Sequence, residues 1–276
     1  IMIISICLPT YNRDKKLHKQ LGIIYNQLKL LNYKYELIVS DNSSTDKTLS
    51  IIKKFKKKFS KLTNVKFVVN INKFNKGFTN NFLKSIDLAS GEYVMTLSDD
   101  DFPKNNFYKK LYEYIIIKKP KGLIFIPLSK KDVIYNYRKN YSTQFTKVNQ
   151  RSGTMSGIIF RTKFISKKYI SNKTLYPQIH MSINYYLRFG LHHMKFDEYI
   201  YLTEERNLIS KFNDNMNRPS DYGVLERFNI IDIYYKKKKI LFKDFFISFL
   251  SMTYWFNDIK YILNNNINNQ HIINTL

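Results

Sequence analysis

Runs of consecutive apolar residues alternate with amphipathic segments over the first third of the chain. An uninterrupted apolar run is typical of a strand covered on both faces, and apolar residues at helical spacing predict a helix with one buried face. The predicted strands span residues 2–8, 35–40, 64–70 and 92–97, and the predicted helices span residues 14–31, 47–59 and 77–89. This alternation predicts an α/β fold, in which helices cover both faces of a parallel sheet.

The pattern is less regular after this part of the chain. The further predictions are strands at 122–127 and 157–161, a loop at 129–152 and a helix at 179–189. From Gly223 onward, aromatic and apolar patches alternate with lysines, which predicts two or three appended helices. We therefore expect a main domain, residues 1–222, followed by a helical C-terminal extension, residues 223–276.

The composition fits a folded protein with a reduced thiol. Hydrophobic residues make up 44% of the 276 positions, which is enough for a sizeable core. Cys7 is the single cysteine, so the chain cannot form an internal disulfide or a cysteine-based zinc site, and a reducing cytoplasm fits. The longest apolar-leaning run, Phe245–Phe256, is shorter than the roughly 18 residues that span a bilayer. We expect a protein that is soluble or peripheral to a membrane.

The formal net charge is +25. Such a surplus attracts polyanions, whether nucleic acid, anionic lipid headgroups or nucleotide diphosphates. Codon bias in an AT-rich coding sequence is an alternative explanation, because the chain is also rich in Asn, Ile, Tyr and Phe. Tyr and Phe stack on sugar rings, but they also simply fill cores.

Polar loops follow three of the predicted strands. They are Thr10–Arg13, Asp41–Ser44 and Asp99–Asp101. The carboxyl ends of parallel strands meet at one edge of a sheet, where ligands bind in such folds. We therefore expect the three loops to converge on one site.

The third loop consists of three adjacent carboxylates, Asp99, Asp100 and Asp101. Their mutual repulsion costs free energy unless a cation or hydrogen-bond donors compensate it. Hard oxygen ligands in a short turn suit Mg²⁺ or Mn²⁺, which share their remaining positions with phosphate oxygens and water. The alternative is a capping cluster at the start of a helix.

Taken together and in order, four segments resemble glycosyltransferase family 2, which has the GT-A fold. The segments are Leu8–Arg13 (LPTYNR), Val39–Asp46 (VSDNSSTD), Asn75–Asn81 (NKGFTNN) and Gly91–Asp101 (GEYVMTLSDDD). A weaker echo follows at Met155–Arg161. The resemblance covers about residues 3–103 and implies a GT-A catalytic domain over residues 1–222, with a nucleotide-sugar half up to about residue 103 and an acceptor half over 104–222.

The resemblance implies roles for the donor half. Nucleotide-binding residues would be Pro9, Thr10, Tyr11, Arg13, Asp41, Asn75, Gly77, Asp99 and Asp100. Asp41 would hold the base, although a turn or capping residue is the alternative. Asp99 would face the ribose or sugar, Asp100 would point toward the donor sugar, and Asp101 would bind Mn²⁺ or Mg²⁺ and so take part in catalysis. UDP is the default nucleotide, because it is commonest in the family.

The family is inverting, so a base must take the proton of the acceptor hydroxyl. Many members place this base in a Glu-Asp pair, but the corresponding stretch here is Leu175–Met181 (LYPQIHM). His180 is the catalytic candidate, because an ordinary histidine titrates near neutral pH. The alternative for His180 is a half-buried histidine or an acceptor contact. Gln178, Glu204 and Glu205 are candidate acceptor residues; Glu204 and Glu205, and more weakly Asp197, are the other candidate bases.

Residues 223–276 suit a peripheral membrane role, because Lys236–Lys239 lie among aromatic residues and Tyr254 and Trp255 follow. The resemblance implies a saccharide or lipid-linked acceptor in bacterial surface-glycan synthesis, in the cytoplasm or at the inner face of the cytoplasmic membrane. An ordinary helical extension is the alternative. Two other functions are alternatives. A nucleic-acid-binding protein lacks a recognised motif here, and a sugar nucleotidyltransferase lacks its Gly-rich pyrophosphate loop. The sequence predicts no oligomeric state.

Overall fold

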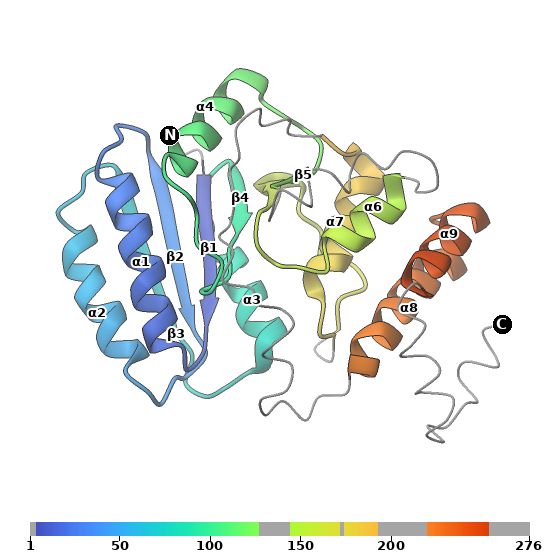
Figure 1. Cartoon of the computed structure of the whole chain (residues 1–276), viewed down its shortest axis with the longest axis horizontal. Helices are drawn as coiled ribbons and strands as arrows, with labels where there is room; N and C mark the ends of the chain where they lie inside the picture. Colours follow the sequence, from blue (N-terminus) through green and yellow to red (C-terminus); the bar gives the residue numbers. More distant parts are fainter. Residues whose placement is uncertain (1–3, 127–143, 172–173, 193–219, 254–276) are drawn as a thin grey trace.

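A six-stranded sheet forms the centre of the computed structural model, which describes residues 4–126, 144–171, 174–192 and 220–253 (Figure 1). The strands are β1 (Ile4–Thr10), β2 (Tyr35–Asp41), β3 (Val65–Ile71), β4 (Tyr93–Thr96), β5 (Ile124–Phe125) and β6 (Ile158–Arg161), in the sheet order β3-β2-β1-β4-β6-β5. The first four strands are parallel, whereas β6 runs antiparallel to both β4 and β5. The expected, mostly parallel α/β sheet is confirmed.

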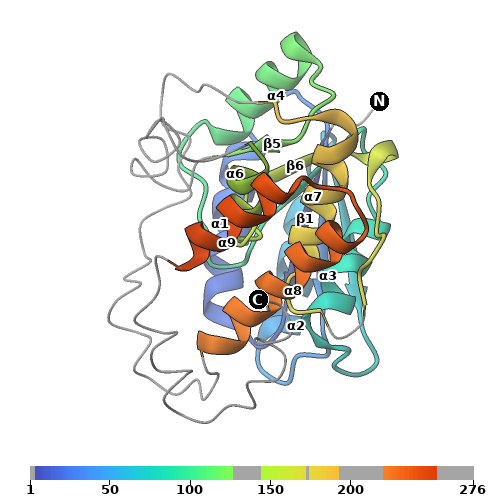
Figure 2. The same cartoon turned by 90° about the vertical axis from the view of Figure 1, so that its right-hand side faces the viewer.

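Helices cover both faces of the sheet, which is why β1, β2 and β4 are buried along their whole length. The helices are α1 (Asp14–Leu28), α2 (Thr48–Phe59), α3 (Gly77–Asp87), α4 (Phe107–Lys118), α6 (Gln144–Arg151), α7 (Pro177–Phe189), α8 (Ser220–Lys236) and α9 (Phe242–Thr253). Helices α1 and α2 lie on one side, α3 and α7 lie on the other, and α8 and α9 form the outermost layer beyond α7 (Figures 1 and 2).

Each face of the sheet has its own apolar core. On one face, Leu17, Leu21 and Ile24 of α1 are fully buried against Leu37 and Val39 of β2, at the helical spacing that the sequence shows. The core on the other face combines residues of α3, α6, α7 and α8. These two cores fix the strands whose ends carry the polar loops.

Several elements differ from the sequence-based expectations. The stretch 129–152 was expected to be a loop, but its end forms α6, whose two apolar residues, Phe145 and Val148, are buried. Two apolar residues are too few to show the helical spacing from which α6 could be predicted. Helix α4 was not predicted, because exposed Ile116 and Ile117 blur its amphipathic pattern.

The C-terminal helices pack on the main domain. Ile230, Ile231 and Tyr234 of α8 are buried in the second core, so this part of the extension is an integral layer. Helix α8 already begins at Ser220, so the division at residue 222 falls within a helix and stays a prediction. Over the described ranges, none of the helices has both the length and the apolar character needed to cross a bilayer.

Candidate functional site

The ends of β1 and β4 meet at the centre of the sheet, where the strand order reverses. Here Thr10 Oγ1 donates a hydrogen bond to Asp99 Oδ2 over 2.7 Å. Both side chains are buried, and burial raises the pKa of Asp99 to about 6, although the Thr10 hydroxyl and Arg13 act against this shift. The hydrogen bond from Thr10 and the charge of Arg13 therefore offset only part of the cost of burying the Asp99 anion.

Asp100 turns toward α1 instead. Its carboxylate lies 3.1 Å from Lys16 Nζ and 3.4 Å from Arg13 Nη1, and it accepts a hydrogen bond from Ser98 Oγ. Although burial acts to raise it, the pKa of Asp100 is lowered, because the hydrogen bonds from Ser98 and Lys16 and the charges of both basic residues favour the anion. Arg13, expected at the nucleotide, is thus paired with the acidic turn.

Asp101 is held by two residues that the sequence did not single out. Ser156 Oγ donates to Asp101 Oδ2 over 2.5 Å and also accepts the backbone N–H of Ser98. Gln20, fully buried on α1, donates to the backbone carbonyls of Ser98 and Asp101, both over 2.8 Å. The turn after β4 is therefore held by α1 on one face of the sheet and by the segment that leads into the neighbouring strand β6. Only the weak echo at Met155–Arg161 pointed to Ser156.

Asp41 is fully buried at the end of β2. Its carboxylate accepts hydrogen bonds from the backbone N–H and the hydroxyl of Ser44, over 3.0 and 2.5 Å. This is the geometry of a turn residue, which was the alternative to the base-holding role. The same Ser44 hydroxyl accepts the N–H of Asn12, and Asn12 Oδ1 accepts the N–H of Thr45, so the first two polar loops interlock.

Three buried asparagines join the ends of β1, β2 and β3. Asn81 of α3 donates to the carbonyl oxygens of Thr10 (3.3 Å) and Ser40 (2.8 Å), and its Oδ1 accepts from Ser40 Oγ and Asn72 Nδ2. Asn72 Nδ2 also donates to Asn42 Oδ1. All four hydrogen-bonding positions of the Asn81 amide are used. This amide network ties the loops after β1 and β2 to the segment that follows β3.

The remaining predicted nucleotide residues lie around this edge. Asn75 Oδ1 accepts from Asn42 Nδ2 and from the N–H of Gly77, the first residue of α3. Gly77 has φ +77°, a conformation that favours glycine. Pro9 is buried within β1, whereas Tyr11 is 41% exposed beside it. The structure thus brings together the residues predicted around the loops after β1, β2 and β4.

His180 lies apart from these loops, in α7. Its side chain is 1% exposed, and its Nδ1 lies 3.4 Å from the hydroxyl of Tyr234 in α8. Burial lowers the pKa of His180 to about 4. A buried imidazole with this pKa is a weak base without access to an acceptor, so the geometry favours the alternative, a structural residue. His180 is thus more deeply buried than the half-buried histidine of that alternative.

Gln178 begins the same helix and is 3% exposed. Its Nε2 lies 3.4 Å from the carbonyl of Gly153, and its Oε1 has no hydrogen-bond partner within the described part of the chain. The other candidates for the acceptor side, Glu204, Glu205 and Asp197, lie outside the described residues. Glu226 of α8, which the sequence did not single out, accepts from the backbone N–H of Leu175 and so supports the segment before α7.

The acidic turn fits a divalent cation only in part. Across the described ranges, no three His, Cys, Asp or Glu side chains are arranged as a complete metal site. Mg²⁺ and Mn²⁺ do not require one, because they are commonly held by one or two carboxylates together with substrate phosphates and water. The two buried carboxylates Asp99 and Asp101 suit a cation that is shared with a diphosphate.

Sequence comparison identifies the family of this site. Residues 5–185 match the sequence profile described as glycosyl transferase family 2. Among curated proteins, the abequosyltransferase RfbV of Salmonella typhimurium is 39% identical over 100 residues, covering 36% of this chain and 28% of the relative. The GalNAc(5)-diNAcBac-PP-undecaprenol β-1,3-glucosyltransferase of Campylobacter jejuni is 36% identical over 99 residues, covering 36% and 29%. The chain spans less than a third of either relative.

Solved structures share the fold. TarS 1–349 of S. aureus superposes with a TM-score of 0.63 at 17% identity, covering 98% of this chain and 77% of that one. The same protein in complex with UDP-GlcNAc gives a TM-score of 0.58 at 18% identity, covering 83% of this chain and 66% of that one. The mannosyltransferase PcManGT of Pyrobaculum calidifontis, in complex with GDP-Man and Mn²⁺, gives 0.61 at 14% identity, covering 90% and 69%. At these identities the likeness establishes the GT-A fold.

Proposed function

The chain belongs to glycosyltransferase family 2, and we propose that it transfers a sugar from a nucleotide diphosphate-sugar to a hydroxyl of a saccharide acceptor. The single observation that carries this proposal is the convergence of Thr10, Asp99 and Asp101 at the point where the strand order reverses. Open α/β sheets bind their ligands at this point. UDP is the proposed nucleotide, and the structural neighbour crystallised with UDP-GlcNAc supports it.

The donor would lie across the loops after β1, β2 and β4. Tyr11 and Pro9 would line the nucleotide, Asp41 and Asn75 would shape its pocket, and Gly77 would bring the start of α3 close to it. Arg13 and Lys16, paired with Asp100, add positive charge beside the expected diphosphate. This charge favours binding of a phosphate-rich ligand in an otherwise acidic turn.

Asp101 is the proposed ligand of Mn²⁺ or Mg²⁺, with Asp99 beside it. When bound, such a cation neutralises charge on the leaving diphosphate. The chain's own contribution is positional. Ser156 fixes one carboxylate oxygen of Asp101, and Gln20 fixes the backbone that carries it. The neighbour crystallised with GDP-Man and Mn²⁺ supports a divalent cation in this fold.

The acceptor half of the reaction is proposed to be a single inverting displacement. A base removes the proton from the acceptor hydroxyl, the oxygen attacks the anomeric carbon, and the nucleotide diphosphate leaves on the opposite face. Because His180 is buried away from solvent, Glu204 and Glu205 become the leading candidates for this base. Gln178 is proposed to contact the acceptor through its Oε1, which is unpartnered within the described residues; because the side chain is 3% exposed, this contact requires the surrounding segment to open.

The proposed acceptor is lipid-linked, and the proposed location is the cytoplasm or the inner face of the cytoplasmic membrane. The Campylobacter jejuni relative, whose name contains an undecaprenol-linked saccharide, supports this choice. The main alternative is a basic nucleic-acid-binding or membrane-binding protein without catalysis, and a sugar nucleotidyltransferase is a lesser one.

A panel of UDP-, GDP-, CDP- and dTDP-sugars tests the proposal. The thermal shift of the protein is measured for each nucleotide-sugar with and without Mn²⁺. The release of the nucleotide diphosphate in the presence of an acceptor is then measured as turnover. We expect one donor to stabilise the protein only with the metal. We also expect Asp101→Ala to abolish metal-dependent turnover. Near wild-type turnover in Asp101→Ala, or no response to any donor, would contradict the proposal.

A further inference from the structure

The turn between α8 and α9 carries an exposed aromatic and aliphatic surface. We call residues 235–246 the α8–α9 corner. Leu241 is 73% exposed, Phe242 61% and Phe246 46%, and Tyr235 is also exposed. The rings stack on one another, with Phe242 and Phe246 centroids 5.8 Å apart. A pre-assembled apolar cluster of this kind is costly to leave in water.

Lysines surround this cluster. Lys236, Lys237, Lys238, Lys239 and Lys243 are all exposed. Lys236 is paired with Asp232 one helical turn earlier, at 2.7 Å. The turn itself is compact, because the backbone N–H groups of Lys238 and Lys239 donate to carbonyl oxygens in the last turn of α8. Positive charge is therefore held close to the exposed rings.

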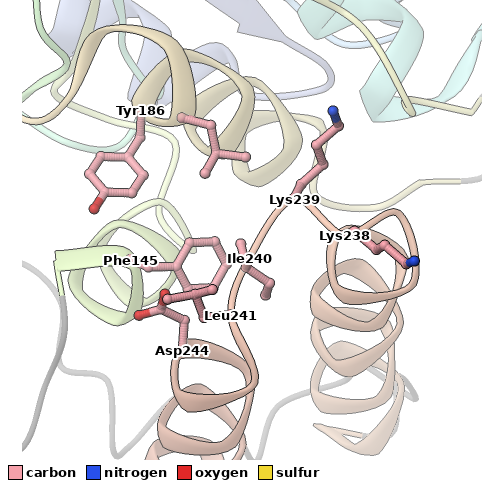
Figure 3. Close-up of a pocket in the computed structure, with 8 residues that line it drawn as sticks. Phe145, Tyr186, Lys238, Lys239, Ile240, Leu241 and Asp244 are labelled. Atoms are coloured by element: carbon pink, nitrogen blue, oxygen red, sulfur yellow. The ribbon is translucent and has the colours of Figure 1, made fainter.

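A pocket of about 180 Å³ lies behind the corner. Phe145 of α6, Tyr186 and Leu187 of α7, and Ile240 and Leu241 of the corner line it, and Lys238, Lys239 and Asp244 complete its wall. Figure 3 shows Lys238 and Lys239 in the turn that follows α8, with their ammonium ends directed away from Phe145, and Asp244 in the first turn of α9. The pocket therefore has largely apolar walls, with the two lysines at its outer side.

We propose that the α8–α9 corner is the surface by which this protein docks on an anionic phospholipid bilayer. Exposed aromatic and aliphatic side chains insert at the headgroup boundary, and the lysines contact the negative headgroups. The pocket gives room for part of a lipid beside Lys238 and Lys239. This inference rests on the proposed function only in naming a membrane as the place where the acceptor is met.

Helix α2 shows why charge alone does not carry this inference. Its exposed side includes Lys53, Lys54, Lys56 and Lys57, yet none of its large apolar side chains is exposed, as the described residues show. A basic helix without apolar contacts attracts any polyanion. The corner combines both features, and this combination matches a bilayer surface better than a nucleic acid.

Flotation of the full chain with vesicles tests the proposal. One set of vesicles contains phosphatidylcholine alone and the other contains phosphatidylcholine with phosphatidylglycerol. The apolar variant is Leu241→Ser with Phe242→Ser, and its control is Leu30→Ser with Ile117→Ser, two equally exposed positions elsewhere. The charge variant changes Lys237, Lys238, Lys239 and Lys243 to Gln, and its control changes Lys53, Lys54, Lys56 and Lys57 to Gln.

We expect binding to the anionic vesicles, and a loss of about tenfold or more in the vesicle-bound to free ratio for each corner variant, because each lysine near an anionic surface contributes on the order of 1 kcal/mol. Both controls should stay within about threefold of the wild type, because the substituted side chains lie outside the corner and would not contact the bilayer. Equal losses in corner and control variants, equal binding to both vesicle types, or no binding at all would overturn the proposal.

Donor-induced thermal shift separates the two proposals. The corner variants should keep the wild-type response to the nucleotide-sugar, which also shows that they are folded. Loss of vesicle binding with an intact donor response supports the corner as a docking surface. A protein that responds to donor but never binds vesicles refutes the corner and leaves the proposed transferase unaffected.

Discussion

Thr10 and Asp99, which are 89 positions apart in the chain, are joined by a buried hydrogen bond of 2.7 Å between the end of β1 and the turn after β4. This bond favours the ionised form of a carboxylate whose pKa is raised by burial. It is also the direct link between the first polar loop and the acidic turn. The bond therefore couples the geometry of the proposed nucleotide site to the charge of the proposed metal site.

Thr10→Val should weaken metal-dependent donor binding about tenfold or more, because a hydrogen bond to a charged group contributes roughly 1.5–3 kcal/mol. Valine keeps the shape of threonine but cannot donate to Asp99. The measurement is the Kd of the nucleotide-sugar by calorimetry at saturating Mn²⁺. Thr10→Ser keeps the hydroxyl and is the control; equal affinities for the valine and serine variants would contradict the role of the bond.

Ser156→Ala should raise the Mn²⁺ concentration needed for half-maximal turnover by about tenfold. The substitution removes the donor to Asp101 and the acceptor for the partly buried N–H of Ser98, a loss of roughly 1–3 kcal/mol. Turnover at saturating Mn²⁺ should fall much less, because the carboxylate itself remains. A metal titration of initial rates checks this. If Ser156→Ala matched the wild type at every Mn²⁺ concentration, the proposed support of Asp101 would be wrong.

Asn81→Asp should weaken donor binding more than Asn81→Gln weakens it. Aspartate keeps the shape but loses both donors to the carbonyl oxygens of Thr10 and Ser40, and it adds a buried charge. Glutamine retains the donors, although its longer side chain strains the site. The readout is the KM for the donor against kcat. A change in thermal stability alone, with KM and kcat unaltered, would reduce the amide network to a purely structural role.

His180→Gln should make the protein less sensitive to acid. The folded-state pKa of His180 is about 4, below the ordinary value of 6.5, so between these values the unfolded chain binds the extra proton. Stability is therefore lost as the pH falls from 6.5 to 4, by roughly 3 kcal/mol from this residue. The variant should lose that much less than the wild type over this range.

Asp99→Asn provides the opposite control, because the folded-state pKa of Asp99 is raised to about 6. The folded protein binds the extra proton there, so Asp99 stabilises it as the pH falls from 6 to 4, and the asparagine variant should be the more acid-sensitive one. Urea unfolding in EDTA at several pH values measures both differences.

An unchanged kcat pH profile in His180→Gln would also separate His180 from the proton-transfer step.

Much of the fold and the donor side of the site could be predicted from the sequence. The runs that became β1, β2 and β4 are mostly apolar and are buried along their whole length, because helices cover both faces of the sheet. The polar loops follow the strands immediately, so their convergence needed only the parallel order. The acceptor side could not be predicted in this way, because its elements are short and irregular and the family's usual Glu-Asp pair is absent.

The sequence by itself determined the α/β alternation, the family and the identity of the acidic turn, since these depend on local periodicity and on ordered motifs. Tertiary structure alone decided what each polar side chain contacts. It paired Asp100 with Arg13, supported Asp101 with Ser156, enclosed Asp41 with Ser44 and buried His180 against Tyr234. Spacing along the chain carries no information on such contacts, because each one joins segments brought together by packing or by the conformation of a turn.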